Sequence, residues 1–221
     1  MKVVEIFNSI EGEGKRAGLP CTFIRLYGCN LNCSYCDSRY ACEDGGYTEM
    51  TINEIVKQVA KFDCPNVTLT GGEPLLHYET NELLRRLADL TRITGKHYQI
   101  NVETNGSITP GLVTTAPHDI FYTMDYKTKS SGMSEHMNLY AIGTLNENDV
   151  LKFVVGSEED MVQALELTQH IKVRAQIYLS PVFGQIEPVE LVKFVQKHQL
   201  WHWKVQLQLH KFIWNPAERG V

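Results

Sequence analysis

The chain has 221 residues, of which 43% are apolar and 21% charged, with a formal net charge of −5 at pH 7. This composition is typical of a globular protein, and no run approaches the roughly 18 consecutive apolar residues that a membrane-spanning helix needs. The acidic balance disfavours a broad nucleic-acid surface. Because MKVVEIF turns acidic at Glu5 before a signal-type apolar region can form, we expect one cytoplasmic domain over 1–221, without membrane or nucleic-acid partners.

Seven short segments, rich in β-branched and aromatic residues and bounded by turn residues, predict strands. They span 21–28, 66–70, 98–103, 119–125, 149–155, 173–180 and 203–209. A further segment, VVEIF at 3–7, adds an eighth strand if it joins the sheet as an edge. Segments with helical periodicity lie between most of these strands, which indicates βαβ units and a mainly parallel sheet.

Three of the helix starts carry recognisable signals. Thr51 and Glu54 form a capping-box pair, Ser157 is placed to cap a second helix, and Pro188 suits the first turn of a third. The predicted fold class is therefore α/β, with the strands and helices arranged as a β/α barrel.

The barrel is predicted to be incomplete. About seven strands, and a 104–118 connection too rich in Pro and Gly for a full helix, favour an open barrel over a closed eightfold one. Functional residues of such folds gather at the carboxyl ends of the strands, so we expect the site there. The polar stretch 127–148 is the segment that we expect to be most mobile.

Three of the six cysteines form a motif, Cys29-x3-Cys33-x2-Cys36, directly after the 21–28 strand. Three thiolates from one short loop can bind three irons of a [4Fe–4S] cluster and leave the fourth iron open. A structural zinc site is the alternative, with Cys42 or a histidine as fourth ligand, although a second C-x2-C knuckle is missing. The scattered Cys21 and Cys64 are interpreted as core thiols.

A second motif, Thr70-Gly71-Gly72-Glu73-Pro74, follows the 66–70 strand. Two glycines let the backbone approach a ligand closely, and the carboxylate complements a cation. Taken alone, the segment could also be a strand-to-helix turn with a capping glutamate.

Together these motifs resemble the radical S-adenosylmethionine enzymes, in which Tyr35 fills the usual aromatic position before the last cysteine. The resemblance implies an incomplete barrel of the radical S-adenosylmethionine type, with a [4Fe–4S] cluster on Cys29, Cys33 and Cys36. It also implies that the open iron chelates S-adenosylmethionine, whose cleavage gives a 5′-deoxyadenosyl radical. Gly72 and Glu73 would hold the methionine ammonium.

Further segments resemble the 7-carboxy-7-deazaguanine synthases over nearly the whole chain. They are EIFNSIEGEG at 5–14, the strand that contains Arg25, CDS at 36–38, ETNG at 103–106 and QLHKFIW at 208–214. The resemblance implies a lyase that contracts 6-carboxy-5,6,7,8-tetrahydropterin to 7-carboxy-7-deazaguanine with loss of ammonia, in queuosine and deazapurine biosynthesis. It further implies Mg²⁺, a reducing partner such as flavodoxin or ferredoxin, and a homodimer.

The resemblance also implies roles for individual residues. Arg25 would bind the substrate carboxylate, with further substrate contacts from Ile10, Glu11, Gly12 and Thr70; the family most often has glutamine at the position of Glu11. Ser38 would bind Mg²⁺ or simply cap the following turn. The cofactor contacts would come from Tyr35, Cys36, Asp37, Gly72, Glu73, Glu103, Asp125, Tyr126, Lys127 and Ser180.

Some alternatives stay open. Glu103 could bind cofactor or substrate, or cap the next turn, and His210 and Lys211 would line the mouth of the barrel. An activase that installs a glycyl radical in a partner protein shares the cysteine motif, but would not need the EGEG turn or Arg25. A zinc-binding interaction module is the non-enzymatic alternative.

Overall fold

The computed structural model describes residues 1–43, 46–111, 119–216 and 218–220. Within them, nine strands form one sheet in the order β3-β1-β2-β4-β5-β6-β7-β8-β9. The strands are β1 Lys2–Ile10, β2 Pro20–Leu26, β3 Thr48–Glu49, β4 Asn66–Gly71, β5 Gln99–Thr104, β6 Ile120–Lys127, β7 Val150–Val155, β8 Gln176–Pro181 and β9 Trp203–Val205. Every neighbouring pair from β2 to β9 is parallel, so the mainly parallel sheet is confirmed.

The seven predicted strands correspond to β2 and β4 to β9. The VVEIF segment lies in β1, which runs antiparallel to β2, but it is not the edge strand because the two-residue β3 pairs on its outer side. A two-residue strand is too short to give a periodic signal. The last strand ends at Val205 rather than 209, because the chain turns there toward the amino-terminal segment.

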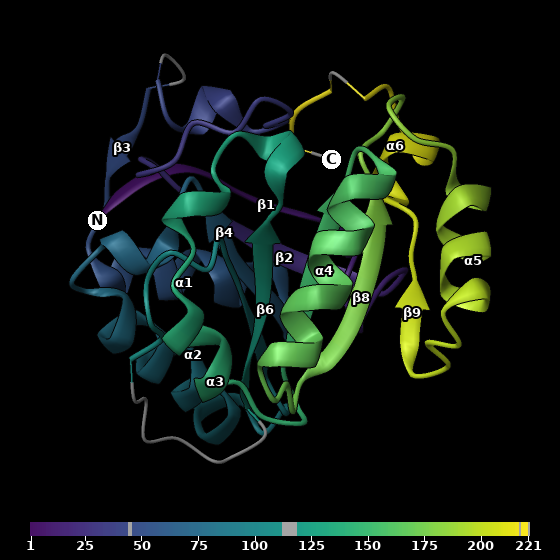
Figure 1. The fold of residues 1–221 in the computed structure, drawn as a ribbon. Helices are drawn as coiled ribbons and strands as arrows, with labels where there is room; N and C mark the ends of the chain where they lie inside the picture. Colours follow the sequence, from purple (N-terminus) through teal and green to yellow (C-terminus); the bar gives the residue numbers. More distant parts are fainter. Residues whose placement is uncertain (44–45, 112–118, 217, 221) are drawn as a thin grey trace.

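Six α-helices are described: α1 Ile52–Phe62, α2 Thr80–Thr94, α3 Leu139–Thr144, α4 Glu158–His170, α5 Pro188–Lys197 and α6 His210–Ile213. The capping box of Thr51 and Glu54 is present, and Ser157 accepts a hydrogen bond from Asp160 N at the start of α4. In Figure 1, α3 and α4 lie in front of the sheet and α5 lies beside β8 and β9.

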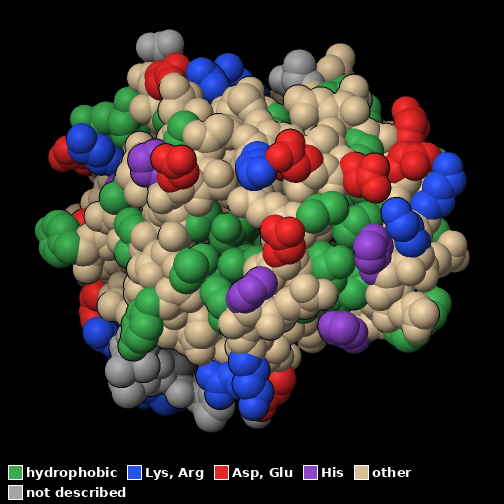
Figure 2. Space-filling view, viewed as in Figure 1, with side chains coloured by type: hydrophobic (Ala, Val, Ile, Leu, Met, Phe, Trp, Pro, Cys, Tyr) green, Lys and Arg blue, Asp and Glu red, His purple; other side chains and the backbone are tan. Residues whose placement is uncertain are grey.

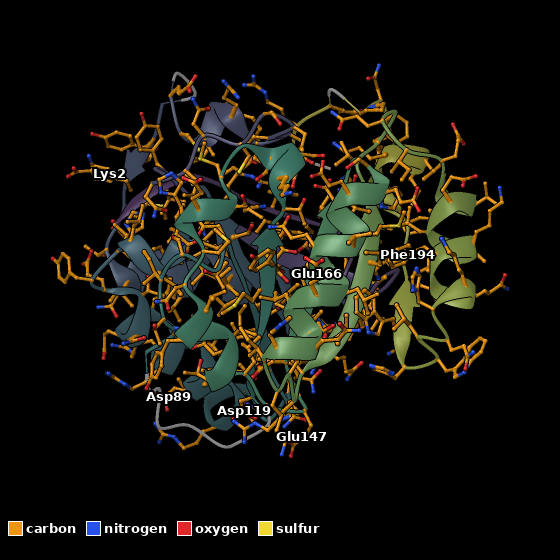
Figure 3. The ribbon with its side chains drawn as sticks, viewed as in Figure 1. Lys2, Asp89, Asp119, Glu147, Glu166 and Phe194 are labelled. Atoms are coloured by element: carbon orange, nitrogen blue, oxygen red, sulfur yellow. The ribbon has the colours of Figure 1, made fainter. Side chains whose placement is uncertain are left out.

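The helices pack on the sheet through two apolar clusters. One joins α1 and α2 to β2, β4 and β5, around Leu69, Leu87 and Ile100. The other joins the later helices to β6, β7 and β8, around Phe153 and Phe194. Figure 3 labels Phe194 on α5. Figure 2 shows acidic and basic side chains interspersed around apolar ones on the helix-covered face. No helix among the described residues is long and apolar enough to cross a membrane.

The sequence predicts two long connections without full helices, at 127–148 and at 104–118. The stretch predicted to be mobile, 127–148, contains two short 3₁₀ helices and α3, whose amino end is capped by the Asn138 side chain. The polar composition of the segment predicts a loop, whereas the structure has short helical elements there, and its mobility stays a prediction. In the 104–118 connection, residues 112–118 lie outside the described residues, so the prediction for that part stays untested.

The ends of the open barrel are joined by the segment that follows β9. Gln206 Oε1 accepts a hydrogen bond from Gly14 N at 2.8 Å, and its Nε2 donates to Gly14 O at 2.8 Å. Leu209 N donates to Gly12 O at 3.0 Å. The turn after β1 is therefore fixed against the carboxyl-terminal part of the chain.

A buried ion pair lies at the amino end of the parallel strands, near the starts of β4 and β5. Arg16 Nη2 is 3.2 Å from Glu11 Oε1, and both side chains are at least 95% buried. The guanidinium also donates to Gln99 O at 2.8 Å and to Val67 O at 3.1 Å, while Thr68 Oγ1 donates to Glu11. The Glu11 side chain therefore pairs in the interior and does not line the cavity, and its contact with substrate stays a prediction.

We expect Glu11→Ala to lower the free energy of unfolding by about 3 kcal/mol or more, because it leaves the Arg16 charge buried without its partner. Glu11→Gln should cost clearly less, since its carbonyl still accepts from Arg16 and Thr68. Urea unfolding followed by circular dichroism measures both variants. Equal stability of Glu11→Ala and the parent chain would contradict the structural role.

Candidate active site

A cavity of about 750 Å³ lies at the carboxyl ends of the parallel strands. Figure 1 shows the arrowheads of β6 and β8 pointing toward this end, where the loop after β2 and the carboxyl-terminal segment gather. Figure 3 marks the opposite end with Asp119 and Glu147, which precede β6 and β7. The location agrees with the expectation for a β/α barrel.

The three motif cysteines all line this cavity. Cys33 is buried, Cys29 half-buried and Cys36 exposed. Their loop is anchored on both sides: Ser34 N donates to Ser131 O at 3.0 Å, and Arg39 Nη2 donates to Cys33 O at 3.0 Å. The sequence motif therefore brings three thiols to one wall of one cavity.

The cysteines differ in their electrostatic surroundings. A hydrogen bond from the Cys42 thiol, together with donors from Leu31 N and Asn105, lowers the pKa of Cys29 to about 6. Burial raises the pKa values of Cys33 and Cys36. Cys29 is therefore the thiol whose anionic form the protein stabilises most directly.

The glycine motif packs directly against the start of the cysteine loop. Glu73 N donates to Gly28 O at 2.8 Å and Gly72 N donates to Leu26 O at 3.0 Å. A Cβ on Gly72 would lie 2.1 Å from Gly28 O, and one on Gly71, where φ is +148°, would lie 2.2 Å from Leu26 O. Only glycine allows these approaches, so the motif serves the contact between two loops as well as exposing backbone to the cavity.

The Glu73 side chain turns away from the cavity. It is fully buried, and its oxygens accept hydrogen bonds from Leu75 N at 2.9 Å, Thr104 Oγ1 at 2.8 Å and Asn105 N at 2.6 Å. Burial raises the pKa of Glu73 to about 7, although the three donors act in the other direction. Its carboxylate connects the end of β4 to the end of β5 and does not line the cavity, and its contact with the cofactor stays a prediction.

Charged side chains from β6 and β7 form the floor of the cavity. Asp125 Oδ2 lies 2.8 Å from Lys127 Nζ and 3.5 Å from Lys152 Nζ, and Lys152 also pairs with Glu13. Burial opposes ionisation of Asp125, but the two lysines lower its pKa. In the same way Asp125 raises the pKa of Lys127 despite its burial.

Two oxygens of this network have no hydrogen-bond partner among the described residues: Glu13 Oε1 and Asp125 Oδ1. Buried polar atoms are normally paired, so these atoms are suited to a ligand. Glu103 lines the same region and hydrogen-bonds to Thr70, and burial raises its pKa.

A second group of polar residues lies on the side of β1 and β2. Arg25 Nε donates to Glu5 Oε1 at 2.7 Å, and its Nη1 donates to Ser38 Oγ at 3.4 Å. The guanidinium also lies over the Phe7 and Tyr40 rings, 5.9 and 5.7 Å from the centroids. Arg25 is thus oriented by one carboxylate while its remaining donors reach the cavity.

Asp37 and Ser38 connect this group to the carboxyl-terminal segment. Ser38 Oγ donates to Asp37 Oδ1 at 2.9 Å, and Lys211 Nζ lies 2.9 Å from Asp37 Oδ2. Although desolvation raises the pKa of Asp37, His210 and Lys211 hold it well below its usual range. His210 and Lys211 line the cavity as expected.

Most of the predicted site residues come together in the cavity. Those that line it are Ile10, Gly12, Arg25, Cys29, Cys33, Tyr35, Cys36, Asp37, Ser38, Thr70, Gly72, Glu103, Asp125 and Lys127. The side chains of four others point elsewhere. Glu11 and Glu73 are engaged in the interior, Tyr126 packs in the apolar cluster beside Phe153, and Ser180 donates to Gln206 O at 3.2 Å.

The position of Tyr126 follows from strand geometry. Successive side chains of a strand point to opposite faces of the sheet, so Asp125 and Lys127 face the cavity while Tyr126 faces the helices. The predicted cofactor contact of Tyr126 stays a prediction for its backbone alone.

Sequence reasoning missed several residues that line the cavity, among them Glu13, Asn105 and Lys152. Lys152 had a usable signal, because a lysine inside the apolar strand VLKFVV must find a partner when the strand is buried. Glu13 had a weaker one, in its spacing of two from Glu11. Asn105 could only be recognised from its neighbours in space.

Comparison with known proteins identifies the class of enzyme. The Radical SAM superfamily model matches residues 23–116, which contain the cysteine loop and the glycine motif. Enzymes of this class use a [4Fe–4S] cluster and S-adenosylmethionine, and the chain is a member of it.

The relatives identify the family. A 7-carboxy-7-deazaguanine synthase from Clostridium acetobutylicum is 43% identical, covering 100% of this chain and 99% of its own. One from Chlorobaculum tepidum is also 43% identical, covering 100% and 97%. The crystal structure of QueE from Escherichia coli, 22% identical, matches with a TM-score of 0.71 over 94% of this chain and 93% of that one, which confirms the incomplete barrel. The chain belongs to the 7-carboxy-7-deazaguanine synthase family.

The residues of this chain fit the cofactors of that class. Three thiols line one wall, the backbone of Gly72 lies beside them, and Asp125 presents an oxygen without a partner. Among the residues described, no three His, Cys, Asp or Glu side chains are placed to hold a single metal ion. A thiol wall open to a cavity of this size suits a cluster with an adjoining organic ligand.

We expect Lys127→Met to weaken S-adenosylmethionine binding roughly tenfold or more, because hydrogen bonds to charged groups contribute about 1.5–3 kcal/mol. Tyr126→Phe is the matched control, because Tyr126 is adjacent to Lys127 in the chain but its side chain faces the helices. This variant should bind S-adenosylmethionine as tightly as the parent does. Calorimetric titration of the reconstituted proteins measures both affinities, with iron content as a check on loading. A similar loss in both variants would exclude a specific contact by Lys127.

Proposed function

We propose that this chain converts 6-carboxy-5,6,7,8-tetrahydropterin to 7-carboxy-7-deazaguanine with loss of ammonia, on the route to queuosine and other deazapurines. The observation that carries the proposal is a single cavity with three cysteine thiols on one wall and the Arg25–Ser38 pair on another. Membership of the synthase family supports the same reaction.

The cysteine wall and the charged floor form the cofactor half of the site. Cys29, Cys33 and Cys36 would hold the cluster, and Gly72, Asp125 and Lys127 would contact the methionine end of S-adenosylmethionine. When bound, the two cofactors supply a 5′-deoxyadenosyl radical that removes a hydrogen atom from the substrate. Lys127, held beside Asp125 at 2.8 Å, provides the cation for the methionine carboxylate, while Asp125 Oδ1 is available to the ammonium.

The β1–β2 side forms the substrate half. Arg25 is the cation for the pterin carboxylate, because a guanidinium binds a carboxylate through two parallel hydrogen bonds. Thr70 and Glu103 face the same space as a hydrogen-bonded pair and suit the amide-rich edge of the ring. Ile10 and Gly12 contribute through their backbone, since the Glu11 side chain between them is buried.

The overall conversion removes one NH₃ from the substrate and is redox-neutral, so the electron that a reducing partner gives to the cluster is not consumed in the net reaction. A redox-neutral reaction allows the hydrogen atom to be returned and S-adenosylmethionine to be regenerated in each turnover. The cavity serves this cycle by holding substrate and cofactor together, and Tyr35, whose hydroxyl donates to Val154 O at 3.2 Å, helps to shape the wall between them.

Ser38 is the proposed Mg²⁺ ligand. Mg²⁺ prefers oxygen ligands and often takes only one or two from protein, the rest from water and substrate. Ser38 Oγ lies between Arg25 and Asp37, within 3.4 and 2.9 Å of their side chains. Ser38 Oγ would hold the ion, which would supply positive charge beside the guanidinium that we assign to the substrate carboxylate.

The remaining proposals concern the protein as a whole. We infer a single core domain over 1–221, a homodimer, a cytoplasmic location, and reduction by a flavodoxin or ferredoxin. Sedimentation analysis tests the dimer, and a mass of one chain across a wide concentration range would reject it.

The function is tested by anaerobic reconstitution of the cluster, followed by reduction and addition of S-adenosylmethionine, Mg²⁺ and the carboxytetrahydropterin. Mass spectrometry should detect 7-carboxy-7-deazaguanine and one equivalent of ammonia. Formation of 5′-deoxyadenosine without that product would keep the class but reject the substrate, and leave a glycyl-radical activase as the alternative. Zinc without iron and sulfide would reject both.

Arg25→Ala should raise the KM for the carboxytetrahydropterin roughly tenfold or more, because a charge-assisted contact worth about 1.5–3 kcal/mol is lost. Uncoupled cleavage of S-adenosylmethionine should be retained. Arg86→Ala serves as control, since Arg86 lies on α2 and bonds to Asn53. An unchanged KM in Arg25→Ala would remove this residue from the substrate contacts.

Ser38→Ala should raise the Mg²⁺ concentration needed for half-maximal activity by about tenfold or more, as expected for loss of a group that holds a metal. Ser38→Thr should restore the parent requirement, because it keeps the hydroxyl. Product formation measured across a Mg²⁺ titration gives the values. If all three proteins need the same concentration, the ligand is not Ser38.

A further inference from the structure

Two hydrogen-bond donors converge on the sulfur of Cys29. Leu31 N lies 3.4 Å and Asn105 Nδ2 3.6 Å from Cys29 Sγ. Cys36 receives a hydrogen bond from Ser38 N. Of the three cysteine sulfurs, Cys29 Sγ therefore accepts the most hydrogen bonds from the described residues.

The orientation of the Asn105 side chain is fixed by its neighbours. Its Oδ1 accepts from Ser107 N at 2.9 Å and from Ser107 Oγ at 2.7 Å. Its Nδ2 donates to Asn30 Oδ1 at 3.0 Å as well as to Cys29. Because the backbone N–H of Ser107 can only donate, the end of the amide that it contacts must be the oxygen, and the other end must be the NH₂ group.

The backbone of Asn105 is held by the buried carboxylate of Glu73. Asn105 N donates to Glu73 Oε2 at 2.6 Å, and Thr104 Oγ1 donates to Glu73 Oε1 at 2.8 Å. Asn105 and Thr104 are themselves buried. A continuous chain of hydrogen bonds thus runs from the glycine motif, through the end of β5, to the first cysteine.

We propose that Asn105 sets the reduction potential of the cluster by donating to the Cys29 sulfur, and that Glu73 is the positioning residue that holds Asn105 in place. The inference rests on the proposed role of Cys29 as a cluster ligand. Hydrogen bonds to cluster sulfurs are one of the factors that set the potential. A donor stabilises the added negative charge of the reduced cluster, so it raises the potential.

The test is a redox titration of the reconstituted full chain, monitored by electron paramagnetic resonance without S-adenosylmethionine. At the midpoint potential of the parent, Asn105→Ala should lower the ratio of reduced to oxidised cluster about tenfold, equivalent to about 59 mV for one electron. Asn66→Ala is the matched control, because its amide donates to Pro20 O at the amino end of β4, and should titrate as the parent.

Asn105→Asp is a second variant for the same titration, to be used if Asn105→Ala does not load iron. It keeps the shape and the acceptor for Ser107, but replaces the donor beside Cys29 with a charged oxygen, so the midpoint should fall further. An unchanged midpoint in a fully loaded variant would overturn the proposal. A parent chain that assembles no cluster would instead reject the proposed function.

The part played by Glu73 is tested by a double-mutant cycle. Glu73→Gln removes an ionisable group and also disturbs Asn105, so its effect is measured at one pH in the parent and in Asn105→Ala. The charge effect is common to both backgrounds. Glu73→Gln should therefore shift the midpoint potential to a more negative value in the parent than in Asn105→Ala, because only the parent has the Asn105 donor to lose. Equal shifts in the two backgrounds would show that Glu73 does not act through Asn105.

Discussion

The contact between Gly72 and Gly28 is the constraint on which the site depends. Parallel pairing of β2 with β4 brings Leu26 opposite Gly71, so the turn after β4 meets the loop after β2 as both leave the sheet. The backbones approach so closely that a side chain at Gly72 would collide with Gly28 O. Because the cysteine loop begins at that point, the thiols and the glycine backbone are fixed relative to one another.

The floor of the cavity carries a different constraint, since it holds several charges in a buried place. Lys152 and Lys127 are balanced by Asp125 and Glu13, yet one oxygen of each carboxylate has no partner among the described residues. Buried charges are costly unless paired. A zwitterionic ligand such as the methionine part of S-adenosylmethionine would complete this arrangement, which links the stability of the floor to the chemistry of the site.

The Glu73 carboxylate has a different role in the structure from the one that the glycine motif predicts. The sequence favours a direct contact between this glutamate and the cofactor, whereas the structure engages both its oxygens within the protein. It thereby orders the turn at Thr104 and Asn105 and, through Asn105, the first cysteine. In the proposed arrangement, this motif residue acts on the cluster indirectly, by positioning Asn105.

The sequence by itself determined the parallel strands, the helix starts at Thr51, Ser157 and Pro188, and the cysteine and glycine motifs, because these follow from local periodicity, capping and spacing. The tertiary structure decided which side chains reach the cavity. Strand alternation directs the Tyr126 side chain toward the helices, and Glu11 pairs with Arg16 in the interior. Lys152 in β7 and Asn105 after β5 line the site although they lie far from the cysteine loop in the chain. Such pairings depend on contacts between residues far apart in the chain, which local pattern does not encode.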